Sequence, residues 1–153
     1  MKAVIQRVAH AKVTVDGKVT GEIQKGYLVL LGVMDGDTEN EMKLMAKKTA
    51  ELRIFRDEND KMNLSVLDVG GEILVVSQFT LCADVSHGRR PSFTPSAKPD
   101  VANDLYLKYV DELKNLGVRN VQKGVFGADM SVELLNAGPV TIIFNTDEWK
   151  KKG

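Results

Sequence analysis

The apolar residues of this 153-residue chain fall into short runs that glycine and polar residues separate. The most prominent run covers residues 74–81, Leu-Val-Val-Ser-Gln-Phe-Thr-Leu, and follows two glycines. Continuous apolar runs rich in β-branched residues are typical of strands buried on both faces. We therefore predict a core strand that carries Ser77, Gln78, Phe79 and Thr80 to one rim, with Gln78 and Thr80 on one side and Ser77 and Phe79 on the other. An ordinary polar end of a core strand would look the same.

Other apolar segments predict further strands. Residues 4–8 and 11–15 predict two short strands, and Asp16-Gly17 predicts a hairpin turn into a returning strand at 19–23. Residues 27–33 form a second run that reads as buried on both faces. The remaining predicted strands cover residues 62–66, 118–125, 130–135 and 140–144.

Two segments have the apolar period of a helix. Thr38 and Glu41 form a capping box, which predicts a helix that ends near Arg53. Pro99 is typical of the first position of a helix, and Gly117 predicts where that second helix ends. The buried stripes are predicted to be Met42, Met45, Ala46, Thr49 and Leu52 in the first helix, and Ala102, Leu105, Tyr106, Tyr109, Leu113 and Leu116 in the second.

Composition limits the classes of function. Lysine plus arginine equals aspartate plus glutamate, 21 each, which argues against coating long nucleic acids but allows a local basic patch. The single cysteine, Cys82, suits a reducing compartment and is expected to be a small buried residue rather than a nucleophile. No signal peptide is expected, and the longest apolar run, 27–33, is too short to span a bilayer. The length fits one domain, residues 1–153.

The segment 83–98 lacks periodicity and predicts a long loop. It contains His87, Arg89, Arg90 and Phe93. Arginine matches the geometry of phosphate, and an aromatic ring can stack on a base, so the loop is a candidate nucleic-acid contact. Its Gly, Pro and Ser residues are also ordinary loop formers. A lysine-rich face on the first helix is open to the same two interpretations, phosphate contact or a solvated surface.

Residues 136–139, Asn-Ala-Gly-Pro, separate two predicted strands. An ordinary hairpin turn is one interpretation, with Pro139 at a strand start where its missing N–H does least harm. A Gly-Pro bond can also be cis, which would turn the neighbouring carbonyls in a fixed direction.

Several kinds of catalytic chemistry lack a motif in this chain. There is no Gly-x-Ser-x-Gly elbow, no Walker loop and no visible Ser–His–Asp triad. The only histidines are His10 and His87, and the acidic segments 35–37 and 57–60 read as turns without the spacing of a metal loop. We expect no metal and no cofactor, so an enzyme here would use backbone groups, hydroxyls or groups of its substrate.

Five segments together resemble one family. Residues 77–81 (Ser-Gln-Phe-Thr-Leu) and 136–141 (Asn-Ala-Gly-Pro-Val-Thr) resemble the two signature motifs of D-aminoacyl-tRNA deacylases. Residues 3–8, 88–93 and 126–130 are similar to that family too, so the resemblance covers essentially the whole chain in order. One departure is Ala137, where the family often carries an acidic residue. It bears only on a contact of that side chain, because the family's feature there is the Gly-Pro backbone.

The resemblance implies an α+β fold of one compact domain, with mostly antiparallel sheets in a barrel-like core, two main helices and a homodimer. It implies a cytoplasmic enzyme that hydrolyses the ester between a D-amino acid and the terminal adenosine of tRNA. The catalytic segment is then Ser77, Gln78, Phe79 and Thr80, with the Phe79 N–H as oxyanion donor and the ribose 2′-hydroxyl helping to activate water.

The resemblance also implies a cis Gly138–Pro139 bond that reaches into the partner subunit's pocket and rejects L-residues. Glycyl-tRNA, which offers no Cβ, would then be cleaved as well. The residues expected to bind the substrate are Gly138, Pro139, Met130, Phe126, Arg7 and Asn136, and those expected to bind tRNA are Arg89 and Arg90.

Three alternatives stay open at this point. Thr80 would be a covalent nucleophile in an older kind of mechanism, although no general base is evident beside it. A tRNA- or DNA-binding module without catalysis would use Arg89, Arg90 and Lys47 for affinity. In a purely structural dimer, the Gly-Pro turn would only pack at the interface.

Overall fold

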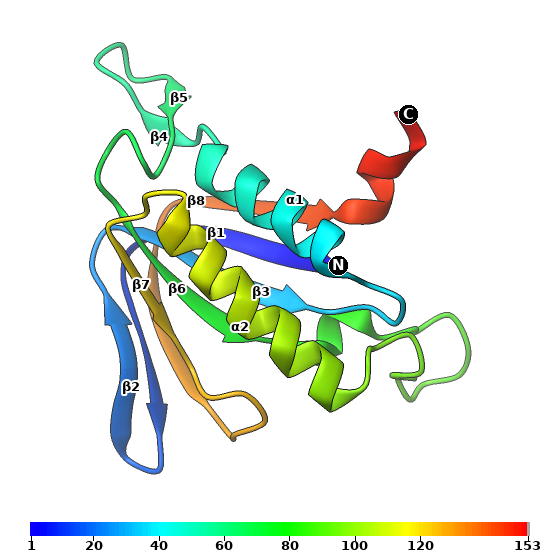
Figure 1. The fold of residues 1–153 in the computed structure, drawn as a ribbon. Coiled ribbons are helices and arrows are strands. Elements are labelled where there is room, and N and C mark those ends of the chain that lie inside the picture. The colour runs from blue at the N-terminus through cyan, green and yellow to red at the C-terminus, as the bar shows by residue number, and fades with distance from the viewer. Residues whose placement is uncertain (153) are drawn as a thin grey trace.

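A strongly curved six-stranded sheet with two helices on one face forms the body of the molecule (Figure 1). The computed structural model describes residues 1–152, with side chains up to residue 150. The sheet contains β1 (Lys2–Val15), β2 (Lys18–Ile23), β3 (Gly26–Gly32), β6 (Glu72–Ser77), β7 (Asn120–Lys123) and β8 (Ser131–Asn145). A separate hairpin consists of β4 (Phe55–Arg56) and β5 (Met62–Leu64). The helices are α1 (Glu39–Glu51) and α2 (Pro99–Asn115), with 3-10 helices η1 (Phe79–Cys82) and η2 (Thr146–Lys152).

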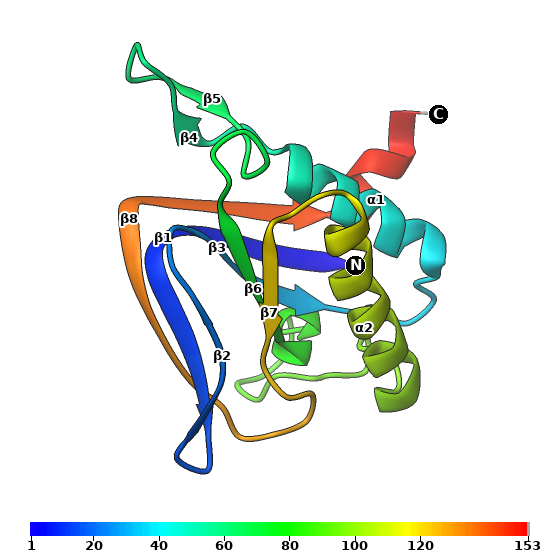
Figure 2. The same ribbon diagram turned by 60° about the vertical axis from the view of Figure 1, so that its left-hand side comes forward.

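The strand order is β2–β1–β3–β6–β7, and β8 pairs with β1. β1 is antiparallel to β2, β3 and β8, whereas β3–β6 and β6–β7 are parallel pairs. The predicted α+β class, the two helices and the barrel-like curvature are confirmed, since the sheet bends round into a nearly closed shape (Figure 2). Several strand bounds are shorter than predicted, notably β5, which ends at Leu64, and β7.

Two pairs of predicted strands are each one continuous strand. The segments 4–8 and 11–15 form β1, and the segments 130–135 and 140–144 form β8, so the prediction of separate strands is wrong. In β1 the polar interruption at His10 is exposed where the strand bends, and the register shifts beside it. Register shifts of this kind bend a strand without ending it. Pro139 is tolerated inside β8 because β8 is an edge strand.

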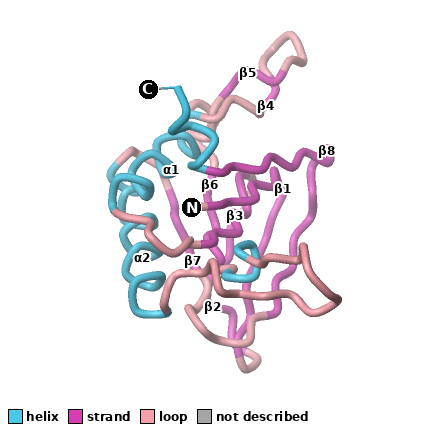
Figure 3. Tube along the Cα trace, turned by 90° about the vertical axis from the view of Figure 1, so that its right-hand side faces the viewer, coloured by secondary structure: helices cyan, strands magenta, loops and turns pink. Residues whose placement is uncertain are grey.

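The apolar core lies on both faces of the sheet. The larger cluster is enclosed by α1 and α2 and includes the fully buried Tyr27, Met45 and Tyr109. The smaller cluster lies on the other face, where β1, β2 and β8 curl over it, and includes Val13, Ile23 and Leu74. Figure 3 shows the two helices together on one side of the strands. The doubly apolar strands β3 and β6 separate these two clusters, as their sequences predict.

The predicted helix ends are confirmed. Thr38 and Glu41 form the capping box of α1, with the Thr38 N–H donating to Glu41 Oε1 at 2.9 Å. Pro99 is the first residue of α2, and Gly117 follows the helix with φ +101°, a conformation that glycine adopts without steric cost. Leu116 does not belong to the buried stripe of α2: its side chain is exposed, and Val110 is buried instead.

Cys82 and the acidic turns match the sequence predictions. The Cys82 thiol is buried, donates to the Val33 carbonyl at 3.4 Å, and has a pKa raised by burial. Asp37 accepts a hydrogen bond from the Met34 N–H at 2.7 Å, as a turn residue does. In residues 1–152 no group of three or more His, Cys, Asp or Glu side chains is arranged to hold a metal ion. No helix within that range is long and apolar enough to cross a membrane.

A buried hydroxyl pair joins the two helices and supports a test of the packing. The Tyr109 O–H donates to Thr49 Oγ1 at 2.9 Å, and Thr49 donates to the Met45 carbonyl at 2.8 Å. Burial raises the pKa of Tyr109, so its hydroxyl stays protonated and needs an acceptor. Thr49→Val is expected to lower the free energy of unfolding by about 1–3 kcal/mol, because it leaves this donor unpaired.

The matched variant Tyr109→Phe should cost less, since Thr49 keeps the Met45 carbonyl. The double variant should be more stable than Thr49→Val alone. Urea denaturation of the three variants measures these differences. If the changes in free energy of unfolding caused by Thr49→Val and Tyr109→Phe simply add in the double variant, the two hydroxyls do not interact.

Candidate functional site

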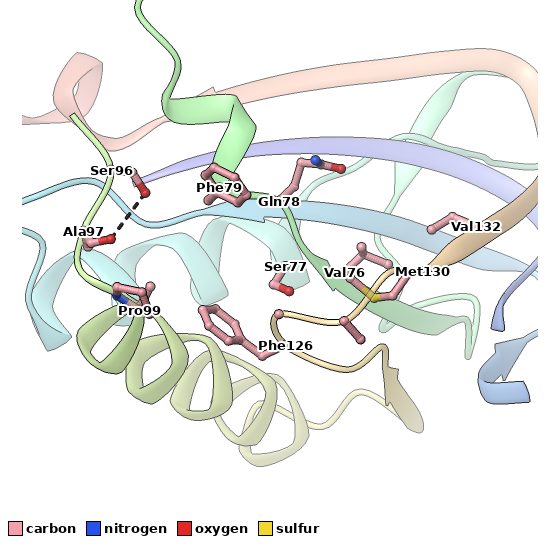
Figure 4. Close-up of a pocket in the computed structure, with 13 residues that line it drawn as sticks. Val76, Ser77, Gln78, Phe79, Ser96, Ala97, Pro99, Phe126, Met130 and Val132 are labelled. Atoms are coloured by element: carbon pink, nitrogen blue, oxygen red, sulfur yellow. Dashed lines mark hydrogen bonds between the residues drawn. The ribbon is translucent and has the colours of Figure 1, made fainter. Parts of the chain in front are cut away.

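A cavity of about 450 Å³ opens where β6 ends (Figure 4). Three parts of the chain form its wall: the end of β6 with η1, the start of α2 with the residues before it, and the loop between β7 and β8 with the start of β8. The lining residues are Val76, Ser77, Gln78, Phe79, Ser96, Ala97, Pro99, Ala102, Phe126, Gly127, Ala128, Met130 and Val132. None of these side chains ionises, so no acid or base of the wall faces the cavity.

The predicted extended strand through residue 81 is wrong, because β6 ends at Ser77. The Gln78 N–H donates to the Leu31 carbonyl at 2.8 Å, and from Phe79 the chain turns into η1. The predicted alternation of side chains from 77 to 80 therefore does not apply. Gln78 Nε2 instead donates to Thr80 Oγ1 at 2.5 Å across the turn.

The start of η1 leaves backbone donors available. The first N–H groups of a helix have no partner within the helix. Among the described residues no group accepts a hydrogen bond from the Phe79 N–H. This donor lies on the residue whose exposed ring forms part of the cavity wall. Thr80 is the one member of the predicted catalytic segment that is not among the lining residues.

Phe79 is 54% exposed and packs edge to face against Phe93, with ring centroids 5.0 Å apart. Phe93 belongs to the long loop 83–98, which projects beyond the sheet (Figure 1). Asp84 and Ser92 pin this loop through two backbone hydrogen bonds of 2.8 and 2.9 Å. Arg89 lies in the exposed part of the loop between them. The predicted loop is therefore ordered at its base and joined to the cavity through an aromatic pair.

Phe126 and Met130 line the opposite wall of the cavity. The ring of Phe126 lies 6.0 Å from that of Tyr106, a buried residue of α2. Burial raises the pKa of Tyr106 to about 12, so its hydroxyl stays protonated and donates to the Val75 carbonyl of β6 at 3.1 Å. Gly124 permits the approach of Met130, whose sulfur would lie 2.6 Å from a Cβ at that position.

The other predicted substrate residues lie elsewhere. Arg7 and Gly138 line a second cavity of about 460 Å³, which also includes Val8, Ala9, Lys25, Phe55, Arg56 and Ala137. Asn136 and Pro139 are exposed neighbours of this cavity on β8. The two cavities share no lining residue. Figure 2 shows the bend of β8 at the edge of the sheet, away from η1 and the start of α2.

Residues 136–139 do not form a hairpin turn but lie inside β8, and the Gly138–Pro139 bond is cis. Gln6 of β1 pairs with Thr141, and Val8 pairs with Asn136, so residues 137–140 of β8 lie opposite Arg7 alone. The Arg7 side chain is 7% exposed and fills this irregularity: its Nε donates to the Ala137 carbonyl at 2.9 Å, and its Nη1 donates to the Ile54 carbonyl at 2.7 Å.

Sequence reasoning missed most of the small and apolar residues of the first cavity. Ser96 and Ala97 precede α2, and Pro99 was recognised only as a helix start. Lys25 and Arg56 of the second cavity were also missed. Nothing in a sequence pattern relates these positions to the motifs, because only the pairing of distant segments brings them together.

Comparisons with known proteins agree with the motifs. The family described as D-Tyr-tRNA(Tyr) deacylase matches residues 4–145. A protein of Fusobacterium nucleatum subsp. nucleatum named D-aminoacyl-tRNA deacylase is 57% identical over 148 residues, which is 97% of both chains. A protein of Clostridioides difficile with the same name is 53% identical over 148 residues, 97% of this chain and 99% of the relative.

Two solved structures share the fold. One, described as c-Myc DNA Unwinding Element Binding Protein, superposes with a TM-score of 0.90 at 41% identity and covers 95% of this chain and 98% of its own. The other, described as a probable eukaryotic D-amino acid tRNA deacylase, has a TM-score of 0.80 at 17% identity, covering 94% and 97%. Its low identity makes it a likeness of fold alone. With the family match over residues 4–145 and relatives above 50% identity along nearly the whole length, the chain belongs to the D-Tyr-tRNA(Tyr) deacylase family.

Proposed function

We propose that this protein hydrolyses the ester bond between a D-amino acid and the terminal adenosine of tRNA. The observation that carries the proposal is the 57% identity, over 97% of both chains, to a relative named D-aminoacyl-tRNA deacylase. The first cavity supports it, because Ser77, Gln78, Phe79, Phe126 and Met130 of the motifs line one pocket. The single buried thiol of Cys82 fits the reducing cytoplasm as the location.

The proposed active site is shared between two subunits. Within one chain Gly138 lies outside the first cavity, so a direct role there requires a second copy. β8 is an edge strand of the sheet, and such strands pair readily with other chains. Leu135 and Ile143, which flank Gly138–Pro139 on β8, are 54% and 73% exposed. Exposed apolar residues along an open edge favour a homodimer that buries β8.

The proposed chemistry uses backbone and substrate groups. Since no ionisable side chain lines the first cavity, the wall offers no general base for a nucleophile. The Phe79 N–H is the proposed donor to the oxyanion of the tetrahedral intermediate, and the ribose 2′-hydroxyl of the substrate helps to activate water. The Thr80 hydroxyl already accepts a hydrogen bond from Gln78, which supports a structural role for it.

Chiral selection is proposed to come from exclusion by the partner's Gly138–Pro139. Arg7 holds the preceding carbonyl of Ala137 in place, and a Cβ at Gly138 would lie 3.0 Å from Arg7 Nη2 and 2.9 Å from Val140 Cγ2. The Gly138–Pro139 segment is therefore packed closely against Arg7 and Val140. A backbone wall of this kind would reject the side chain of an L-residue by clash and leave that of a D-residue free. The exposed Arg89 and Arg90 are the proposed contacts to tRNA phosphates.

A second candidate function is nucleic-acid binding without catalysis. It is favoured by the 41% identical structure that is described as a DNA unwinding element binding protein. This candidate predicts affinity for nucleic acid but no release of amino acid. Incubating the protein with D-Tyr-tRNA, with L-Tyr-tRNA as the control, and measuring free tyrosine separates the two candidates. Release from the D-form alone supports the proposed enzyme.

The role of Thr80 gives the first test of the mechanism. If backbone and substrate groups carry the chemistry, Thr80→Ala should retain kcat within about tenfold of the unsubstituted protein. The control Thr80→Ser keeps a hydroxyl. A loss of about 10⁴-fold in Thr80→Ala, with Thr80→Ser active and both variants folded, would instead establish a direct chemical role for the hydroxyl.

The exclusion mechanism also makes a prediction about glycine. Glycine has no Cβ, so a wall that acts by clash has nothing to repel, and glycyl-tRNA should be cleaved while L-alanyl-tRNA is spared. Positive recognition of one methyl group would supply only about 1–3 kcal/mol of discrimination. The assay compares deacylation of Gly-, D-Ala- and L-Ala-tRNA at equal enzyme concentration. Resistance of glycyl-tRNA equal to that of L-alanyl-tRNA would show that the pocket recognises the D side chain itself.

A further inference from the structure

The second cavity is lined by positive charge. Arg7, Lys25 and Arg56 contribute to its wall, and the other lining residues are Val8, Ala9, Phe55, Ala137 and Gly138. No carboxylate belongs to the lining, although the chain as a whole has equal numbers of acidic and basic residues. The volume of about 460 Å³ is similar to that of the first cavity. A concave, cationic site of this size is suited to an anionic group.

The guanidinium of Arg7 is fixed and retains donors for a ligand. Its Nε and Nη1 are occupied by the carbonyls of Ala137 and Ile54. Its Nη2 makes no hydrogen bond to another described residue. Among those residues, every fully buried side-chain nitrogen or oxygen has a hydrogen-bond partner, so an atom without one cannot be fully buried. Nη2 is therefore accessible. It lies beside Gly138, where an added Cβ would be 3.0 Å away.

Two flexible cations complete the wall. The Lys25 ammonium lies 5.6 Å from the centre of the Phe55 ring, a cation–π contact, and both residues line the cavity. Arg56 Nη1 lies 3.2 Å from Asp60 Oδ1, but both side chains are largely exposed. A surface pair of this kind is weak, so it leaves Arg56 available to a stronger anion. Arginine and lysine together are the usual ligands of a phosphate.

We propose that the second cavity binds a phosphodiester of the tRNA whose terminal aminoacyl-adenosine occupies the partner subunit's first cavity. This inference depends on the proposed function and extends it to the nucleotides before the terminal adenosine. The link is direct, because Ala137 and Gly138 line the cavity and belong to the segment proposed to meet the aminoacyl group. A single-stranded 3′ end brings one negative charge per nucleotide to this place. Each subunit thus contributes the filter and a phosphate contact to the same substrate.

The test compares two substrates of unequal charge. D-Tyr-tRNA carries the phosphates, whereas the D-tyrosyl ester of adenosine has the same reacting group and none. Lys25→Ala is expected to lower kcat/KM for D-Tyr-tRNA about tenfold, as the loss of one charged contact does. The slope of log kcat/KM against log salt should become shallower by about 0.7. The ratio of kcat/KM for D-Tyr-tRNA to kcat/KM for the adenosine ester should fall by the same factor of about ten, because the ester has no phosphate to lose contact with.

Lys18→Ala is the matched control, because it removes one exposed positive charge on β2 that does not line the cavity. It should leave the ratio of the kcat/KM values for the two substrates unchanged. An equal loss with both substrates in Lys25→Ala, or no loss with either, would overturn the phosphate site while leaving the deacylase function intact. If the unsubstituted protein cleaves neither substrate, the proposed function fails and the phosphate contact fails with it.

Discussion

The bridge that Arg7 makes across the β1–β8 ladder is the interaction on which the arrangement depends. Four residues of β8 lie opposite this one residue of β1, and such a mismatch would leave backbone groups of the ladder unpaired. The guanidinium fills the space and is mostly buried. It donates hydrogen bonds to the carbonyls of Ala137 and Ile54 and so joins the two segments. It thereby ties the Gly138–Pro139 segment to the chain that follows α1. The rest of β8 is held by its pairing with β1 on both sides of this irregularity, so the contribution of Arg7 is local to residues 137–140.

The two cavities then divide the chemistry. The first has mostly apolar walls with a few neutral polar side chains, no ionisable side chain, and an available backbone donor at Phe79. The second has three cations and no carboxylate in its lining. In the proposed dimer, one subunit's first cavity would meet the other's second cavity along β8. Ester chemistry by neutral groups and anchoring by charge would then be separate tasks, each carried by a different subunit.

Local patterns in the sequence predicted the two helices and the positions of most strand segments, whereas long-range pairing determined how those segments join and where the core strand ends. The capping box of Thr38 and the glycine at position 117 specify helix ends through contacts with near neighbours, so they are visible in the sequence. The continuity of β1 through His10 was not visible, because it depends on partners on β3 and β8. The turn at η1 likewise depends on the hydrogen bond from Gln78 to Leu31. For the site, the motifs identified the residues around Ser77 and Gly138, but Lys25 and Arg56 reach the second cavity only through the tertiary fold.

The claim that the active site is completed by the partner subunit is tested most directly with mixed dimers. Ala128→Trp fills the first cavity of its own subunit, and Gly138→Ala alters the proposed filter of its own subunit, where the added Cβ would lie 2.9 Å from Val140 Cγ2 and 3.0 Å from Arg7 Nη2. A doubly tagged heterodimer of these two variants has one open pocket, on the Gly138→Ala chain, and one intact filter, on the Ala128→Trp chain. We expect this heterodimer to discriminate D-Ala-tRNA from L-Ala-tRNA as the unsubstituted protein does, unlike the Gly138→Ala homodimer. Selectivity equal to that of the Gly138→Ala homodimer would place pocket and filter in the same chain and contradict an active site shared between subunits.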